Sequence, residues 1–184
     1  GFARHLFAHR QKRYALTQFH IYIAVFHPLN HAGHNLVQFA VKFVKGDVKT
    51  GTENSKLKEE AYSLRVTSGG ALITAMDTRG FYYGMKTLEQ LLLRRGGTTT
   101  IAACDIVDWP DFEIRGFMND VGRNYMPLPL IARELDSMAQ LKLNVYHFHF
   151  TENPGWRLES KIYPELNDSR NYTRMPGKFY TQKE

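Results

Sequence analysis

The stretch EIRGFMNDVGRNYMPLPLIARELDSMAQLKLNVYHFHFT (residues 113–151) has the pattern of a strand, a helix and a second strand. EIRGFMND at its start and NVYHFHFT at its end are rich in apolar and aromatic residues, which is typical of strands. Pro127-Leu128-Pro129 opens the helix, and its apolar face contains Ile131, Leu135, Met138 and Leu141 or Leu143. Short connections in this order predict a parallel sheet or the start of a (β/α)8 barrel.

Polar residues follow both predicted strands. Ligands bind at the carboxyl ends of strands in such folds, so Asp120 after the first strand and His149 and Glu152 after the second are candidate site residues. Arg115 lies inside the first predicted strand, where burying an ion without a partner costs several kcal/mol or more. Two interpretations stay open: Arg115 pairs with Asp120 or another neighbour for structure, or it is kept for a ligand.

Residues 1–110 are predicted to form a small α/β domain, an antiparallel sheet with a packed helix. FHIYIAVF (19–26) and LVQFAVKFV (36–44) favour two strands, or a strand and a short helix. Residues 45–59 are expected to form a polar loop. AYSLRVT and ALITAMD flank Ser68-Gly69-Gly70, which predicts a β-hairpin.

A helix is predicted after this hairpin, in GFYYGMKTLEQLLLRRGG (80–97). Four apolar residues recur at helical spacing: Phe81, Met85, Leu88 and Leu92. Arg94 and Arg95 suit the negative end of the helix, and Gly96-Gly97 stops it. An extended segment follows, and Asp108-Trp109-Pro110-Asp111 marks a domain boundary, because proline disfavours helix before it and cannot donate within a ladder. Residues 111–184 then form a second domain.

The composition argues against nucleic-acid and membrane binding. The net charge of +6 belongs to residues 1–50, which carry seven Lys/Arg against one acid, and the terminal cluster Arg4, Arg10, Lys12 and Arg13 is not a basic stripe with interleaved aromatic residues. No run approaches the roughly 20 apolar residues that span a bilayer. The start of the chain lacks the apolar run and cleavage site of a signal peptide.

The histidines and the cysteine give no metal-site pattern. Six of the eight histidines fall within the first 34 residues, without a His-x-x-x-His on a clear helix or an accompanying cysteine or carboxylate. Cys104, the single cysteine, is expected to be a small buried residue. Neither a metal nor a cofactor is predicted.

Four motifs in order resemble family-20 glycoside hydrolases, the β-N-acetylhexosaminidases. They are YYGMKTLEQLL, D-x-P-x-F-x-x-RG-x-x-x-D-x-x-R-x-Y, DSMAQLKLNVYHFHF and GWRLESKIYPEL, across roughly residues 56–178, whereas residues 1–50 match poorly. The resemblance implies an accessory α/β domain (1–110) and then the first two strands and first helix of a (β/α)8 barrel (111–184). The barrel is incomplete, because a whole one needs about 250 residues.

The resemblance also implies an activity and roles for individual residues. The family removes terminal β-linked N-acetylglucosamine or N-acetylgalactosamine by retaining catalysis, with the substrate's own acetamido oxygen as the nucleophile. Arg115 is expected to bind the 3- and 4-hydroxyls of the terminal sugar with its planar fork of donors. Support of the site is expected from Asp120, Arg123, His149 and Glu152. Glu152 stands where the family usually has aspartate, and its longer stem displaces the carboxylate.

The family's adjacent Asp-Glu catalytic pair does not occur in this sequence and is expected beyond Glu184. The expected partner is a glycan or glycoconjugate, in a secreted, periplasmic or lysosomal setting, and the oligomeric state is left open. Two alternatives remain. The chain is a non-catalytic truncated product or sugar-binding remnant, which weak sugar binding without hydrolysis would favour. Otherwise it is an interaction module whose basic N-terminal segment recruits an acidic partner, which salt-sensitive binding would favour.

Overall fold

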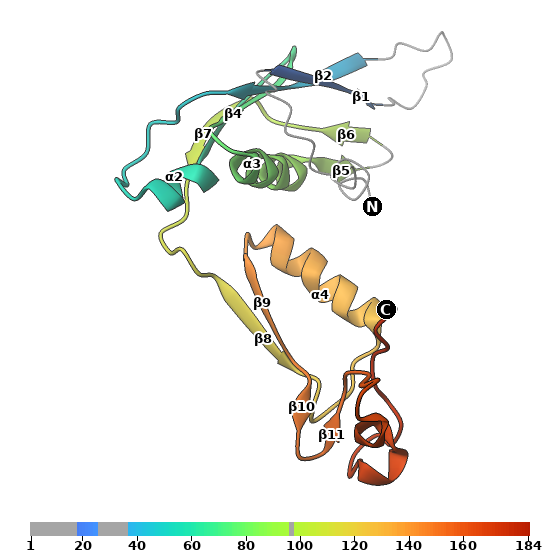
Figure 1. Cartoon of the computed structure of the whole chain (residues 1–184). Coiled ribbons are helices and arrows are strands. Elements are labelled where there is room, and N and C mark those ends of the chain that lie inside the picture. Colours follow the sequence, from blue (N-terminus) through green and yellow to red (C-terminus); the bar gives the residue numbers. More distant parts are fainter. Residues whose placement is uncertain (1–17, 26–36, 96–97) are drawn as a thin grey trace, which may run out of the picture. The chain divides into compact units, whose positions relative to one another are not determined.

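The computed structural model describes residues 18–25, 37–95 and 98–184 (Figure 1). The chain divides into two compact units, Gly1–Pro110 and Asp111–Glu184. The division follows Pro110, which cannot donate a backbone hydrogen bond. Within the described ranges, no helix combines the length and apolar character that crossing a bilayer requires.

A five-stranded sheet forms the body of the first unit. Its strand order is β1-β2-β4-β3-β7, with β1 at Gln18–Val25, β2 at Val37–Lys45, β3 at Tyr62–Thr67, β4 at Gly70–Ala75 and β7 at Cys104–Asp108. The pairing of β1 with β2 confirms two strands there in place of a strand and a helix. The segment 26–36 between them lies outside the described residues.

The sheet is mixed, which corrects the expectation of a purely antiparallel one. β2 and β4 are parallel, while the other neighbouring strands are antiparallel. The reason is the crossover from β2 to β3, which carries the helix α2 (Ser55–Glu60). The chain then turns back at the predicted hairpin, so β4 runs in the direction of β2 and pairs beside it.

Helix α2 lies in the segment that the sequence analysis assigned to a polar loop. The Asn54 side chain accepts a hydrogen bond from the backbone amide of Lys56 and caps the helix. Leu57 and Glu60 are its buried residues. The single buried leucine gives too weak a periodic pattern to reveal so short a helix in the sequence.

Helix α3 (Thr78–Leu91) packs on the sheet (Figure 1). Its Tyr83 and Leu88 join the buried cluster formed by β2, β3 and β4, and Phe81 and Met85 pack against that cluster. The helix ends earlier than predicted, since Leu92 already has an extended backbone with φ −73° and ψ 114°.

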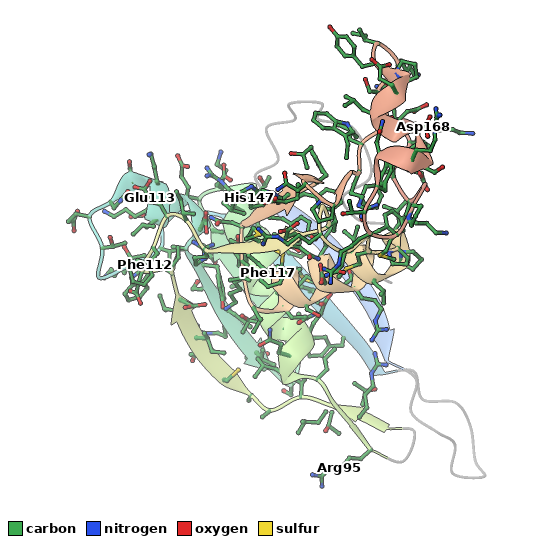
Figure 2. The ribbon with its side chains drawn as sticks, turned by 90° about the horizontal axis from the view of Figure 1, so that it is seen from below. Arg95, Phe112, Glu113, Phe117, His147 and Asp168 are labelled. Carbon is green, nitrogen blue, oxygen red and sulfur yellow. The ribbon has the colours of Figure 1, made fainter. Side chains whose placement is uncertain are left out.

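Arg94 and Arg95 therefore do not lie in the last turn of α3, as the sequence analysis expected. They belong to β5 (Leu93–Arg95), which pairs with β6 (Thr98–Thr100). β5 is exposed, and Arg95 projects from the end of this ribbon (Figure 2). The three threonines of β6 are β-branched and favour a strand, and pairing with β6 keeps Leu93–Arg95 extended.

The second unit contains the predicted strand, helix and strand. They are β8 (Gly116–Asp120), α4 (Leu128–Gln140) and β9 (Val145–His149), and β8 and β9 are parallel. Glu113, Ile114 and Arg115 precede β8, although the sequence analysis placed them in the strand. The hairpin of β10 (Thr151–Glu152) and β11 (Gly155–Trp156) follows, and then two short 3-10 helices, η1 (Pro164–Asn167) and η2 (Ser169–Asn171).

Residues of β8 and β9 alternate between two faces. Phe117 lies on the side of α4 and stacks with Tyr146, while His147 lies on the opposite face with His149 (Figure 2). On α4, Ile131 and Met138 are buried as predicted, but Leu135 and Leu141 are exposed. Two strands cover only a narrow part of the apolar stripe of this helix, and the sheet is not closed.

Candidate functional site

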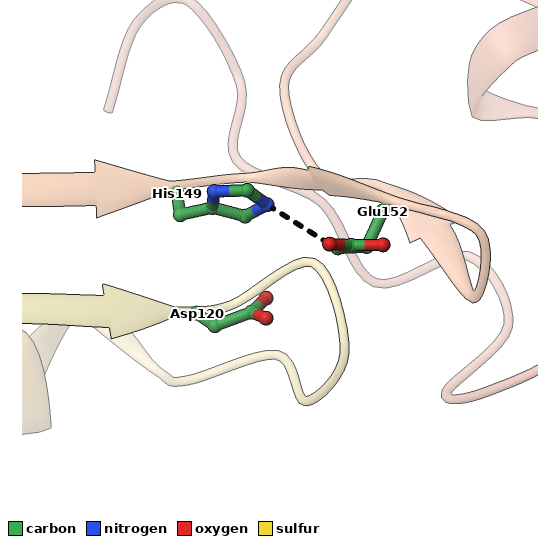
Figure 3. A group of neighbouring side chains, drawn as sticks. All are labelled: Asp120, His149 and Glu152. Carbon is green, nitrogen blue, oxygen red and sulfur yellow. Dashed lines mark ion pairs between the residues drawn. The ribbon is translucent and has the colours of Figure 1, made fainter.

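Four charged or titratable side chains gather at the carboxyl ends of β8 and β9. Asp120 is the last residue of β8 and pairs in register with His149, the last residue of β9. Glu152 is placed beside them by the β10–β11 hairpin (Figure 3). The structure thus brings together the four residues that the sequence analysis named as supporting the site: Asp120, Arg123, His149 and Glu152.

Arg123 binds two carboxylates of this cluster. Its Nη1 lies 3.0 Å from Asp120 Oδ2, and its Nη2 donates to Glu152 Oε1 at 3.1 Å. Its backbone amide also donates to Asp120 Oδ1 at 3.0 Å. Two neighbouring carboxylates bind separate nitrogens of the planar guanidinium, which restricts its orientation although Arg123 lies on a loop.

The guanidinium of Arg123 remains accessible while it is held. The side chain of Arg123 is 59% exposed, whereas that of Asp120 is 16% exposed. Among the described residues, Nη1 of Arg123 pairs with Asp120 and Nη2 pairs with Glu152. A guanidinium has five N–H donors, so these two contacts do not use all of them. Donors therefore remain that a ligand at the strand ends can use.

His149 approaches the oxygen of Glu152 that Arg123 also binds. Its Nε2 lies 3.5 Å from Glu152 Oε1, and this nitrogen is buried without a hydrogen-bond partner among the described residues (Figure 3). The same oxygen of Glu152 therefore faces both the guanidinium of Arg123 and the imidazole of His149. Glu152, which the resemblance puts where the family usually has aspartate, reaches both neighbours in this structure.

The same cluster has donor atoms suited to a metal ion. Ligand atoms of Asp120, His149 and Glu152 lie within 4.8 Å of one another. However, both carboxylates already pair with Arg123. A metal cation would have to displace the guanidinium or lie beside its positive charge, so the cluster is better suited to hold an arginine than a metal.

Arg115 lies at the opposite end of β8. Its Nε donates to Lys142 O at 2.8 Å, its Nη1 donates to Phe112 O at 2.6 Å, and its backbone amide donates to Asn144 Oδ1 at 2.9 Å. A five-residue strand spans about 16 Å at roughly 3.3 Å per residue, so this guanidinium is far from the Asp120 end. Arg115 therefore lies away from the Asp120 end of the strand, and its expected binding of a sugar stays a prediction. Arg115 orders the start of the strand.

Gly122 is a site residue that the sequence analysis did not name. The backbone amides of Val121 and Gly122 both donate to His149 O, at 2.9 and 3.2 Å. A Cβ at Gly122 would lie 2.9 Å from Glu152 Cβ. Only glycine lets the loop after β8 pack this closely on Glu152, and the sequence signal was the glycine directly before Arg123.

Comparison with known proteins identifies the family of this chain. Residues 27–109 match the model of glycosyl hydrolase family 20, domain 2, and residues 112–184 match the model of the family 20 catalytic domain. The chain belongs to glycoside hydrolase family 20. It contains the accessory α/β domain and the opening of the catalytic domain, as the resemblance implied.

Relatives in family 20 come from bacteria and animals. The chain is 38% identical to the beta-hexosaminidase of Porphyromonas gingivalis over 141 residues, covering 70% of this chain and 18% of that protein. It is 34% identical to the human beta-hexosaminidase subunit beta over 116 residues, covering 62% of this chain and 21% of that protein. The chain thus spans about a fifth of the length of these curated relatives.

A solved family 20 structure shares the fold. The exo-β-N-acetylglucosaminidase of Vibrio harveyi, in complex with N-acetylglucosamine, superposes with a TM-score of 0.64 at 32% identity. The match covers 77% of this chain and 23% of that one. This likeness confirms the predicted fold class, a mixed α/β domain followed by part of a barrel.

Proposed function

We propose that this chain is the N-terminal part of a β-N-acetylhexosaminidase, which removes terminal β-linked N-acetylglucosamine or N-acetylgalactosamine from a glycan or glycoconjugate. The relatives named above are beta-hexosaminidases, and the Vibrio harveyi enzyme was solved with N-acetylglucosamine. The observation that carries the proposal is an accessible guanidinium, Arg123, fixed by two carboxylates at the carboxyl ends of β8 and β9.

The proposal gives Arg123 the role that the sequence analysis gave to Arg115. Two neighbouring hydroxyls of a pyranose ring present acceptors at a spacing that a planar fork of N–H donors matches, and a lysine ammonium does not. Asp120 and Glu152 keep that fork in one plane before a sugar arrives, so little side-chain entropy is lost on binding. Arg115 donates from Nε and Nη1 to backbone carbonyls at the other end of β8.

In this proposal the residues of the chain bind and orient the sugar. Substrate-assisted retaining catalysis uses the acetamido oxygen of the sugar to attack its own anomeric carbon while an acid protonates the leaving oxygen. The 184 residues contain no adjacent Asp-Glu pair to orient the acetamido group and supply that proton. The contribution proposed for this chain is therefore the recognition of the ring hydroxyls.

The basic N-terminal segment offers a second function, an interaction module, which stays a prediction. Residues 1–17 lie outside the described part of the chain. Nothing in the described residues favours it over sugar binding.

A titration of the chain with N-acetylglucosamine tests the proposal. The backbone amide signals of Asp120, Gly122 and Arg123 are expected to shift in an ¹⁵N–¹H NMR spectrum as the sugar is added. Arg123→Lys keeps the charge but loses the fork, and we expect at least a roughly tenfold weaker affinity, about 1.4 kcal/mol.

Arg115→Lys is the matched control, because it makes the same change at the other end of β8. It should leave the affinity for N-acetylglucosamine within about twofold, since Arg115 directly precedes β8 and is not at the carboxyl end of the strand, where Asp120 lies. A 4-deoxy analogue should bind the wild-type chain more weakly than the parent sugar. If Arg115→Lys weakens binding and Arg123→Lys does not, the assignment of Arg123 is wrong. If the wild-type chain binds neither sugar, the proposed function fails for this chain.

A further inference from the structure

Arg157 is a fully buried arginine in the segment that follows the β10–β11 hairpin. Within the described part of the chain, its side chain donates only to backbone carbonyls. Nε donates to Val121 O and Gly122 O at 3.1 and 3.2 Å. Nη1 and Nη2 donate to three carbonyls of the 174–178 segment, at 2.8–3.1 Å: Arg174 O, Met175 O and Lys178 O. One guanidinium thus joins the loop after β8 to a segment more than fifty residues further along the chain.

This cation is stabilised by dipoles and by an aromatic ring. No carboxylate pairs with Arg157 among the residues that the structure describes, and the Tyr172 ring lies 4.9 Å from Arg157 Cζ. Burial lowers the pKa of Arg157 from its usual value. A guanidinium suits the position because its donors fan out in one plane toward several carbonyls, whereas the three donors of a lysine radiate from one atom.

The sequence around Arg157 is shaped to fit this side chain. A Cβ at Gly155 would lie 2.5 Å from Tyr172 Cδ1 and 2.8 Å from Arg157 Cζ. The glycine of the GWR motif therefore leaves room for the arginine and the tyrosine to stack. The motif encodes a buried anchor, which the sequence analysis did not identify.

The two residues that Arg157 holds come directly before Arg123. The amides of Val121 and Gly122 donate to His149 O from one side, and their carbonyls accept from Arg157 Nε on the other. The three peptide groups from Asp120 to Arg123 are therefore held by hydrogen bonds, and Val121 is fully buried. Asp120 directly precedes Val121 and Arg123 directly follows Gly122. The positions of Asp120 and Arg123 therefore depend on the backbone of these two residues.

We propose that Arg157 is a positioning residue that sets the place of Arg123 through the backbone of Val121 and Gly122. The consequence for sugar binding rests on the proposed function of Arg123. Removal of the Arg157 guanidinium lets the backbone of Val121 and Gly122 rotate. The Arg123 guanidinium then no longer meets Asp120 and Glu152 in one plane. A misplacement of about 1 Å in such a group can cost about a hundredfold in rate, so a measurable loss of affinity is expected.

The test compares Arg157→Lys with Arg170→Lys in the chain 1–184. Arg170 is an exposed arginine of the same unit that pairs with Asp168 close to it in sequence, so it controls for the chemical change. Two quantities are measured on folded protein, well below the midpoint of thermal unfolding. They are the affinity for N-acetylglucosamine and the hydrogen-exchange rate of the Arg123 backbone amide, which Asp120 protects in the wild type.

We expect Arg157→Lys to raise the exchange rate of the Arg123 amide about tenfold and to weaken sugar binding about tenfold, with neither change in Arg170→Lys. Faster exchange with unchanged affinity would overturn the positioning role and leave the proposed function standing. Absence of sugar binding by the wild-type chain would remove the proposed function, and the exchange rates would still decide whether Arg157 fixes the loop.

A second measurement covers the case in which Arg157→Lys does not fold. In the wild type, the Arg157 Nε–H and the Arg123 amide should have protection factors, each relative to the intrinsic exchange rate of its own group, within about threefold of each other, because one local opening exposes both. A protection factor of the Arg123 amide more than about tenfold below that of Arg157 Nε–H would show that the two groups open separately, and the proposal would then be wrong.

Discussion

Three arginines of the second unit show how partners decide the role of one residue type. Arg115 and Arg157 donate to backbone carbonyls and order the chain, one at the start of β8 and one beneath the loop that follows it. Arg123 pairs with carboxylates and remains exposed. A side chain whose donors are turned toward backbone carbonyls serves the fold, and one held from the side by acids retains donors for a ligand.

Tyr180 is the residue on which the stability of the second unit is predicted to depend at alkaline pH. Its hydroxyl donates to Met126 O at 2.6 Å, and its ring stacks with Tyr125 at 4.8 Å. Burial raises the pKa of Tyr180 to about 12. The pKa of an unfolded tyrosine is about 10. A folded pKa above the unfolded one means that this stabilisation is fully present below about pH 10 and is lost as the pH rises toward about 12.

Tyr180→Phe removes this hydroxyl and tests the effect. At pH 8 the free energy of unfolding should fall by about 1–2 kcal/mol, because Met126 loses its hydrogen-bond partner. The difference from wild type should narrow above about pH 10, since the variant has no phenol to ionise there. Urea unfolding at a series of pH values measures both. Tyr163→Phe, at an exposed tyrosine, is the control and should show no effect. A constant difference up to pH 12 would contradict the prediction.

The elements of the first unit show which features a sequence reveals. The β3–β4 hairpin was predictable because its turn needs glycine: Gly70 has φ 135°, and a Cβ there would lie 2.2 Å from Ala40 O. The end of α3 was not predictable from Arg94 and Arg95. Charges near a helix end carry little energy compared with the pairing of β5 with β6, which depends on residues further along the chain.

The close approach of α3 to the sheet leads to a prediction about Gly80. A Cβ at this position would lie 2.3 Å from Ala61 O and 2.8 Å from Ala75 Cβ. Alanine is favoured over glycine in a helix by about 1 kcal/mol, but overpacking against backbone costs about 1–3 kcal/mol or more. We expect Gly80→Ala to destabilise the first unit by at least about 1 kcal/mol in urea unfolding.

Gly69→Ala is the matched control for this substitution. The nearest atom to a Cβ at Gly69 is Thr67 Oγ1, at 3.8 Å, so the change should stay within about 0.5 kcal/mol. A Gly80→Ala variant as stable as the wild type would mean that α3 can move away from the sheet at little cost.

The elements of the second unit were predictable, but the use of each arginine was not. The pattern of residues 113–151 predicted β8, α4 and β9, and parallel pairing then brought Asp120 and His149 together. The bounds of β8 decided which arginine lies at which end. The sequence placed Arg115 within the strand, whereas the strand begins at Gly116. The structure therefore places Arg115 before the strand, and it places Arg123 with Asp120 and Glu152 after the strand.

On the scale of the whole molecule, the second unit exposes apolar surface that a closed barrel would cover. Phe117 and Met118 of β8 are 44% and 53% exposed, and Leu141 after α4 is 71% exposed. Parallel strands normally have both faces covered. The chain spans about a fifth of the length of its curated relatives.

The last prediction separates binding from catalysis in this chain. The chain 1–184 should bind N-acetylglucosamine and yet release no chromophore above background from a chromogenic β-N-acetylglucosaminide, because it has no adjacent Asp-Glu pair. Glu152 is the carboxylate of this cluster that accepts from Arg123 Nη2, and it is the residue to test as a proton donor. Turnover that Glu152→Gln abolishes would show that Glu152 donates the proton after all. Turnover that survives Glu152→Gln would place the acid elsewhere in the chain. Turnover of either kind would contradict the prediction that this chain only binds the sugar.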